Sequence, residues 1–266
     1  MKLTFLGTGS AFAMKNWQTN MLIEFEDGYR LLIDCGGDIR WALADYDLTY
    51  LNINGVYVSH LHADHIGGLE WLAFTTYFDP RYQGRPDLFI SEFLVDDLWT
   101  RSLSGGLASL QGKRNTINRF FNVHPVEKNG TFSIDHPTNS PEFQLVQTVH
   151  FVNGYTFELS FGLIFKAGDE TVFITTDTQY APRQIQDFYN KATVIYHDAE
   201  CSPFRSGVHA HFDELAELDE KTKSKMYLTH YQDTVVDDWE KWEKKAEDAG
   251  FKGFIRKGHV VEFHEE

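Results

Sequence analysis

Short apolar runs and amphipathic segments alternate along the whole 266-residue chain. Apolar runs bounded by turn-forming residues predict strands, and apolar residues repeating every three to four positions predict helices. The predicted strands are 2–10, 53–60, 142–150, 156–168, 170–178, 192–200 and 225–231, with a further pair in a hairpin over 21–37. The predicted helices are 39–48, 66–78, 182–190, 212–224 and 237–250.

One stretch breaks this pattern. Between about residues 79 and 141, Gly, Pro, Ser and Asn are scattered and no period is clear. Strands that alternate with helices form a layered α/β domain. We therefore expect a single domain over 1–266, with an insertion at about 79–141 that serves as a lid or a dimer arm.

The composition narrows the class of protein. A hydrophobic content of 42% is that of a globular protein. A net charge of −15 argues against a protein that binds nucleic acid over its whole surface. Two cysteines, Cys35 and Cys201, suit a reducing compartment. The chain starts without the apolar stretch of a signal peptide, and no run is long enough to cross a membrane. We expect a cytoplasmic protein without a membrane partner.

Four side chains that can bind metal lie within the six residues HLHADH. His60 and His62 alternate at a strand end and so share one face, while Asp64 and His65 follow on the turn into a helix. Imidazole and carboxylate are good ligands for zinc and similar metals. Because the cluster lacks Cys, it favours an open catalytic site over a closed structural one. Hydrogen-bonding loop residues are the alternative interpretation.

HLHADH resembles the HxHxDH signature of the metallo-β-lactamase fold hydrolases. FLGTGSA at 5–11 resembles the opening turn of that family, and LLIDCG at 31–36 resembles its strand ending in a buried Asp. The later motif positions of the family correspond, in order, to His150, Asp177 and His230. The resemblance implies an α/β fold, the metallo-β-lactamase αββα sandwich, in which two mixed β-sheets are flanked by helices.

The resemblance also implies a centre of two divalent metal ions, Zn²⁺ or alternatively Mn²⁺. One ion would take His60, His62 and His150, the other would take Asp64, His65 and His230, and Asp177 would bridge both. A carboxylate has two oxygens, so Asp177 at a strand end can present one to each ion. Asp34 is expected to orient a ligand imidazole without binding metal. Asp64 is counted among the catalytic residues as well as the ligands.

Two histidines in GVHAHFDEL, His209 and His211, precede a predicted helix. In tRNA 3′-endonucleases and related phosphodiesterases of this fold, a histidine just before a helix protonates the leaving oxygen. The resemblance therefore implies a general acid here. We favour His211, which is nearest the helix start, with His209 as the alternative. A pair of exposed loop histidines without a catalytic role is the structural alternative.

Segments 160–165, 172–185 and 206–215 resemble the phage anti-Pycsar proteins of the RNase Z-like branch, which hydrolyse cyclic nucleotide monophosphates. The resemblance implies that cyclic CMP or cyclic UMP is opened to the linear monophosphate, which would counter cyclic-nucleotide signalling against phages. The setting would be the host-cell cytoplasm if a phage encodes the chain. One alternative is an RNase Z-like tRNA 3′-processing endonuclease, although the acidic charge argues against a large RNA ligand. The other is a nucleotide-binding protein that sequesters its ligand without catalysis.

The predicted insertion holds one basic stretch, because no acidic residue lies between Asp97 and Glu127. Its candidate contacts to a mononucleotide are Arg101, Lys113, Arg114, Arg119 and His124. A solvated loop is the alternative. The apolar segment SLSGGLASLQG favours contact with a partner subunit, so we expect a homodimer. The expected substrate is a cyclic mononucleotide, and no large nucleic-acid ligand is expected.

Overall fold

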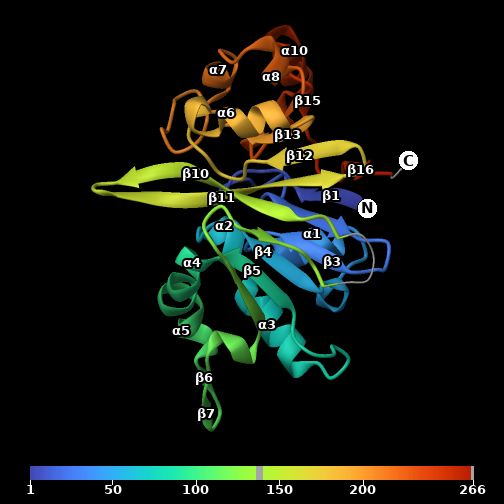
Figure 1. Cartoon of the computed structure of the whole chain (residues 1–266), viewed down its shortest axis with the longest axis vertical. Coiled ribbons are helices and arrows are strands. Elements are labelled where there is room, and N and C mark those ends of the chain that lie inside the picture. The colour runs from blue at the N-terminus through green and yellow to red at the C-terminus, as the bar shows by residue number, and fades with distance from the viewer. Residues whose placement is uncertain (136–139, 265–266) are drawn as a thin grey trace.

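The computed structural model describes residues 1–135 and 140–264, and it places two seven-stranded sheets face to face (Figure 1). The first sheet contains, in spatial order, β16 (Val260–Glu262), β1 (Lys2–Gly7), β2 (Asn20–Glu24), β3 (Arg30–Ile33), β4 (Gly55–Val58), β5 (Asp87–Ser91) and β8 (Asn122–Val126). The second contains β15 (Gly253–Phe254), β14 (Met226–Thr229), β13 (Val194–Asp198), β12 (Glu170–Ile174), β11 (Thr156–Ala167), β10 (Phe143–Asn153) and β9 (Thr131–Phe132). Both sheets are mixed, since antiparallel hairpins in each continue into parallel strands.

Helices cover the outer face of each sheet. Those that follow the first-sheet strands are α1 (Ile39–Ala44), α2 (Ala63–Ile66), α3 (Leu69–Phe78), α4 (Glu92–Asp97) and α5 (Ser104–Leu107), with 3₁₀ turns η1 (Tyr50–Asn52) and η3 (Ile117–Arg119) and a π-helical segment η2 (Leu98–Leu103). Those that follow the second-sheet strands are α6 (Pro182–Lys191), α7 (Phe212–Leu215), α8 (Glu220–Lys223), α9 (Asp233–Asp237) and α10 (Trp239–Ala249). None of the helices in the described part of the chain has the length and apolarity to span a bilayer.

Three apolar clusters hold these layers together. The central one joins the facing sides of the two sheets, with Phe5 and Tyr57 from one sheet and Phe143 and Tyr196 from the other. A second cluster packs the first sheet against α1 and α3, and a third packs the second sheet against α6 and α10. Burial of apolar area on both faces of each sheet is the main driving force for this stack. The αββα prediction is confirmed.

Two predicted helices differ in the structure. The helix expected over 66–78 begins at Leu69, as α3, and the separate short helix α2 precedes it; at Gly67 and Gly68, between them, the chain lies too close to its neighbours for a side chain. A Cβ on Gly68 would come within 2.5 Å of the Gly36 carbonyl oxygen. The helix expected over 212–224 becomes α7 and α8, because Asp219 caps a new helix by accepting the Thr222 amide at 2.9 Å.

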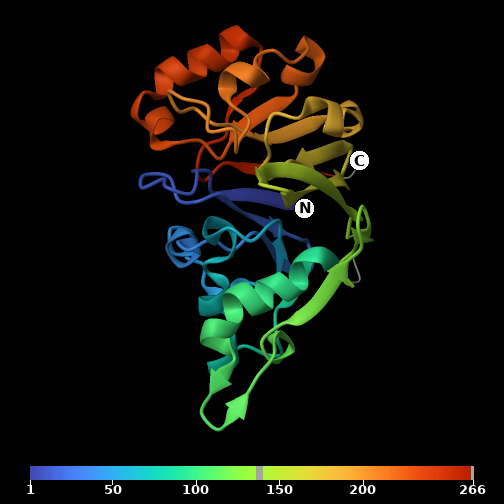
Figure 2. The ribbon, with the colours of Figure 1, turned by 90° about the vertical axis from the view of Figure 1, so that its left-hand side faces the viewer.

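The range 79–141 contributes three strands of the main sheets that its weak periodicity did not reveal: β5 and β8 in the first sheet and β9 in the second. Strand β5 pairs in parallel with β4, and β8 pairs in parallel with β5, so both belong to the first sheet. The part that leaves the sheet runs from α4 to η3 and carries the small hairpin of β6 (Ser109–Leu110) and β7 (Lys113–Arg114). That hairpin forms one end of the molecule in both views (Figures 1 and 2). Residues 136–139, near the end of the predicted insertion, lie outside the described residues.

Candidate metal centre

Most of the predicted ligands follow the carboxyl ends of strands in the two sheets. His60 lies two residues after β4, Asp177 three after β12, and His230 directly after β14. β4 lies in a parallel run of the first sheet, and β12 and β14 lie in one of the second. Carboxyl ends of parallel strands meet at one edge, which is where open α/β sheets build their sites. His150 comes instead from within β10.

A β-bulge directs His150 to the site. In the β10–β11 pairing Val149 lies opposite Leu159 and Phe151 opposite Glu158, so His150 has no partner on β11. A bulge of this kind turns one side chain away from its regular direction. The imidazole Nδ1 then donates to the Val208 carbonyl oxygen at 3.0 Å.

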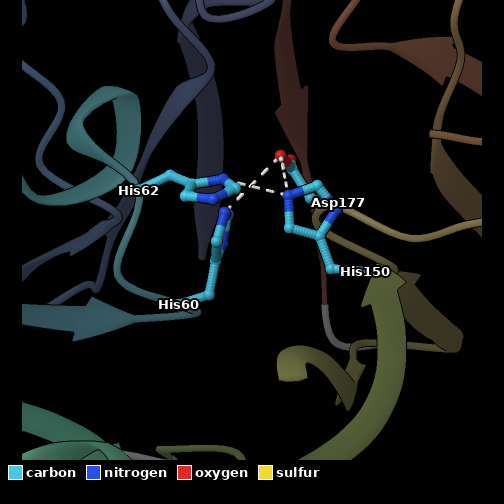
Figure 3. A group of neighbouring side chains, drawn as sticks. All are labelled: His60, His62, His150 and Asp177. Carbon is cyan, nitrogen blue, oxygen red and sulfur yellow. Dashed lines mark hydrogen bonds and ion pairs between the residues drawn. The ribbon is translucent and has the colours of Figure 1, made fainter. Parts of the chain in front are cut away.

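The first ligand group consists of His60, His62, His150 and Asp177, whose side chains point toward one another (Figure 3). Asp177 Oδ2 lies 3.6 Å from the Nε2 atoms of both His60 and His150. His62 Nδ1 lies 3.0 Å from His150 Nε2. All four ligand atoms are within 4.8 Å of one another, which is compact enough for one cation.

The second group consists of Asp64, His65, Asp177 and His230. His65 Nε2 lies 3.2 Å from Asp64 Oδ2 and 3.3 Å from Asp177 Oδ1, and His230 Nε2 lies 3.5 Å from Asp177 Oδ2. Asp177 therefore belongs to both groups, with Oδ1 facing His65 and Oδ2 facing His60, His150 and His230. The structure brings all seven predicted ligands together.

Hydrogen bonds leave the Nε2 atoms of these histidines free to bind. Ser59 donates its hydroxyl proton to Asp34, so His60 Nδ1 must donate to Ser59 Oγ, 3.0 Å away. By the same reasoning His230 Nδ1 donates to Thr19 Oγ1, whose proton is given to Gly9. A histidine with its proton on Nδ1 carries a lone pair on Nε2.

Three of the buried Nε2 atoms are suited to binding metal. The Nε2 atoms of His60, His65 and His230 are buried without a hydrogen-bond partner among the described residues. A buried polar atom without a partner is costly and usually has a ligand or water. A set of neutral imidazoles and carboxylates is the donor set of Zn²⁺ and Mn²⁺ sites.

Asp34 occupies the position predicted for an orienting residue. It accepts the His65 Nδ1 proton at 2.7 Å, and it also accepts the amide and hydroxyl of Ser59, each at 2.8 Å. Its backbone φ of 63° lies in the left-handed region, as do those of Thr176 (53°) and His230 (61°). Left-handed backbone is costly for side chains other than Gly, and such strain clusters at functional sites.

The electrostatics of the cluster favour neutral His60 and an ionised Asp177. Burial holds the pKa of His60 well below its ordinary value, and it lowers the pKa of His150 to about 4. Burial opposes ionisation of Asp177, but the facing histidines His230, His65 and His60 outweigh it and hold its pKa well below the usual range. A buried anion within a cage of imidazoles is suited to a cation.

His209 and His211 lie in different surroundings. His209 Nδ1 donates to Asp198 Oδ2 at 2.7 Å and lies 3.9 Å from Asp177 Oδ2. Burial opposes its protonation, yet Asp198 outweighs burial and raises the pKa of His209 to about 9. His211 caps α7: its Nδ1 accepts the Asp213 amide, and its Nε2 donates to the Ser202 carbonyl oxygen at 3.0 Å. The geometry thus reverses the order of preference, because only His209 lies against the ligand groups.

The basic residues of the predicted insertion do not reach this cluster in the same chain. Arg101 pairs with Asp97, Arg119 donates to the Tyr77 hydroxyl, and His124 bonds to Asp87. Lys113 and Arg114 are exposed on the β6–β7 hairpin. That hairpin lies at the end of the molecule away from the second sheet (Figure 2).

Sequence reasoning missed Asp198. With His209 and His230 it forms a third group of neighbouring ligand atoms. His230 offers only Nε2, since its Nδ1 is bonded to Thr19, so the second and third groups compete for one atom. The signal was present: Asp198 lies near the end of the predicted strand 192–200, in YHDAE, as Asp177 does in the predicted strand 170–178. Ser59 and Thr19, which orient two ligands, had no such signal.

Comparison with solved structures places the fold. The metallo-β-lactamase fold protein YhfI from Bacillus subtilis has a TM-score of 0.72 at 18% identity, covering 98% of both chains. A diphosphatase of the PhnP family has a TM-score of 0.70 at 18% identity, covering 99% of this chain and 98% of that one. The short form of human tRNase Z has a TM-score of 0.68 at 16% identity, covering 99% and 100%. These likenesses show the metallo-β-lactamase fold.

Comparison of sequences gives the family. Residues 1–261 match the family model described as Anti-Pycsar protein Apyc1. The protein of that name from Bacillus phage vB_BveM-Goe7 is 35% identical over 241 residues, which is 88% of this chain and 90% of that protein. The one from Paenibacillus harenae is 35% identical over 237 residues, covering 88% and 91%. These matches show that this chain, with its metallo-β-lactamase fold, belongs to the Anti-Pycsar protein Apyc1 family.

Proposed function

We propose that the protein is a dinuclear metal-dependent phosphodiesterase that hydrolyses cyclic nucleotide monophosphates, such as cyclic CMP and cyclic UMP, to linear monophosphates. Such an activity would counter cyclic-nucleotide signalling against phages. The observation that carries the proposal is the pair of His/Asp groups that share Asp177. Family membership and the resemblance of the 160–215 segments support the substrate class.

In this proposal His60, His62 and His150 would hold one divalent ion, Asp64, His65 and His230 would hold the other, and Asp177 would serve both. The ions would be Zn²⁺ or Mn²⁺. When bound, two such ions polarise phosphoryl oxygens and increase the acidity of water. Asp34 and Ser59 keep His65 and His60 in their orientations, as do Thr19 and the Val208 carbonyl for His230 and His150.

His209 is the proposed general acid, in place of His211. The reaction forms a bond from phosphorus to a water oxygen and breaks the bond from phosphorus to one ribose oxygen. That ribose oxygen is a poor leaving group and needs a proton. His209, protonated through its contact with Asp198, supplies it from Nε2. Asp64, whose carboxylate lies beside His65 and His230, is proposed to accept a hydrogen bond from the attacking water.

A small substrate fits the charge of the molecule. The net charge is −15, and the basic β6–β7 hairpin lies at the end of the molecule away from the second sheet (Figure 2). A tRNA precursor would require many phosphate contacts, whereas a cyclic mononucleotide presents one phosphate. A role for Lys113 and Arg114 in substrate binding then requires the arm of a second subunit. Homodimerisation and a cytoplasmic location are further parts of the proposal.

A substrate panel tests the proposal. Purified protein with Zn²⁺ or Mn²⁺ is offered cyclic mononucleotides, cyclic dinucleotides and a tRNA precursor, and products are separated by chromatography. We expect linear monophosphates from the first group alone. Cleavage of the tRNA precursor in preference to the cyclic mononucleotides would favour the alternative function, a tRNA 3′-processing endonuclease. Stoichiometric binding of cyclic CMP without product, in protein that contains two metal ions, would favour the sequestering protein.

A further inference from the structure

Two buried polar atoms behind the metal centre have no hydrogen-bond partner among the described residues: Asp198 Oδ1 and Thr229 Oγ1. Asp198 is 1% exposed and Thr229 is 4% exposed. Both side chains line one enclosed cavity between the sheets. His65 and His230 line the same cavity and also have an unpartnered Nε2, which the proposed metal would bind. Buried polar atoms are nearly always paired, so Asp198 Oδ1 and Thr229 Oγ1 call for another partner.

Strand pairing places these two residues side by side. Asp198 ends β13 and Thr229 ends β14, and their Cα atoms are partners in the parallel register. The amide of Ala199 donates to the Thr229 carbonyl oxygen at 2.9 Å. Partnered residues on neighbouring strands lie about 4.8 Å apart and project to the same face.

The rest of the Asp198 carboxylate is already engaged. Its Oδ2 accepts the Thr178 amide at 3.0 Å and the His209 Nδ1 proton at 2.7 Å. Oδ1 is the remaining atom, and Asp198 and Thr229 both line the cavity. A hydroxyl can donate one proton and accept others, whereas an ionised carboxylate only accepts.

The cavity has the size and polarity for one water molecule. The centre of a water-sized sphere can move within about 10 Å³ of it, which is room for a single water. Its other polar lining residues are Thr19, Asp34, His65, Thr176, Asp177 and His230. A buried water commonly makes about three hydrogen bonds, so a donor to Asp198 Oδ1 and an acceptor from Thr229 Oγ1 suit it.

We propose that Thr229 holds a buried water against Asp198 Oδ1 and is thereby a positioning residue for His209. The water anchors one carboxylate oxygen while His209 and Thr178 anchor the other. Rotation of the carboxylate about its Cβ–Cγ bond is then restricted, and the Nε2 of His209 keeps its direction. The part that concerns His209 rests on the proposed function, whereas the water site does not.

A crystal structure at high resolution tests the water site directly. We expect one ordered water within hydrogen-bond distance of both Asp198 Oδ1 and Thr229 Oγ1 in the metal-loaded protein, and its loss in Thr229→Val. A direct bond between the two side chains would overturn the proposal. So would density at the shorter distances of a bound cation.

Kinetics test the link to His209. Thr229→Val should lower kcat for cyclic CMP about fivefold, the worth of one hydrogen bond, with KM and metal content unchanged. Thr229→Ser should restore the rate, because it restores the hydroxyl. Hydrolysis of bis(p-nitrophenyl) phosphate should be unaffected, because its leaving group needs no proton. Thr76→Val is the matched control, since Thr76 is as buried but bonds only within α3.

The outcomes separate this inference from the proposed function. If wild type opens cyclic CMP and Thr229→Val slows both substrates equally, or neither, the positioning role is wrong. If wild type produces no linear monophosphate but the water is present, the proposed function fails and the water site stands. If Thr229→Ser is as slow as Thr229→Val, the hydroxyl is not the group that matters.

Discussion

The position of one proton on each imidazole decides what the clustered histidines can bind. His60, His65 and His150 each donate from Nδ1, to Ser59, Asp34 and the Val208 carbonyl. Their Nε2 atoms then face Asp177, at 3.6, 3.3 and 3.6 Å. His211 has the opposite arrangement: its Nδ1 accepts the Asp213 amide in a helix cap, and its Nε2 donates to the Ser202 carbonyl oxygen. Residue type alone does not distinguish these cases, since the same side chain serves as a ligand, an acid or a cap according to its neighbours.

His209→Ala and His211→Ala should therefore differ. Loss of the proposed general acid should lower kcat for cyclic CMP about a hundredfold, with little effect on bis(p-nitrophenyl) phosphate. Loss of the cap should destabilise the fold by about 1 kcal/mol and leave most of the activity. Turnover of both substrates and thermal unfolding measure these effects. Equal activity losses in the two variants would contradict the assignment.

The charge of Asp198 should set the alkaline limit of activity. His209 carries its proton below its pKa and loses it above, so the rate should fall as pH rises through that value. Asp198→Asn removes the main influence that raises the pKa of His209. The alkaline limb of kcat against pH should then move to lower pH. Asp213→Asn, which removes a nearby exposed carboxylate that does not contact His209, should leave the limb in place. A limb that stays where it is in Asp198→Asn would refute the pairing.

Strand ends, one bulge and one tight helix start carry the site at the level of elements. The bulge at His150 and the left-handed residues Asp34, Thr176 and His230 turn the backbone at points where a regular strand would send side chains elsewhere. The turn between α2 and α3 is a further irregularity that positions site residues. It sets HLHADH close against the residues after β3, where Cys35 accepts the Gly68 amide at 2.8 Å.

Gly68→Ala should disrupt that contact. Its Cβ would lie 2.5 Å from both the Gly36 carbonyl oxygen and Ile39 Cγ2, so the helix start must shift. We expect a loss of about 1–3 kcal/mol in the free energy of unfolding and a fall in metal affinity. Gly105→Ala in α5 is the control, because a Cβ there meets nothing within 4 Å. Urea unfolding measures both, and equal stability of the two variants would be evidence against the close approach.

At the level of the whole molecule, the two sheets supply the ligands jointly. His60, Asp64 and His65 come from the first sheet's connections, and His150, Asp177 and His230 come from the second. Metal bound between them, as proposed, would link the two halves across the central core. The basic β6–β7 arm extends away from this arrangement at one end of the molecule (Figures 1 and 2).

Metal removal should lower the stability of the whole domain. Ions that bind only the folded state stabilise it by about 2.7 kcal/mol per site at a free concentration a hundred times Kd. Chelation should lower Tm, and Zn²⁺ or Mn²⁺ should restore it. Asp177→Asn should lose most of this response, whereas Asp169→Asn, in an exposed turn, should keep it. A Tm that does not depend on metal in wild type would exclude the proposed centre.

The arm should matter only through a second copy. Lys113→Ser with Arg114→Ser should raise KM for cyclic CMP several-fold if the hairpin of one subunit reaches the site of another. Sedimentation should then show a dimer. Lys244→Ser with Lys241→Ser, on the exposed face of α10, removes the same charge elsewhere and serves as the control. An unchanged KM, or a monomer, would leave the arm without a role in binding.

The sequence by itself predicted the layered fold from its apolar periodicity, and it predicted the seven candidate ligands through the resemblance of its motifs to a known family. Apolar periodicity specifies which faces are buried, and most of the candidate ligands follow strand ends that meet at a sheet edge. Only the tertiary structure decided between His209 and His211, because the choice depends on Asp198 and on a cap formed by local backbone. It also showed that β5 and β8 belong to the first sheet and that Lys113 and Arg114 lie away from the cluster. Strand pairing and the direction of a long arm depend on contacts between distant segments, which a local pattern of residues does not encode.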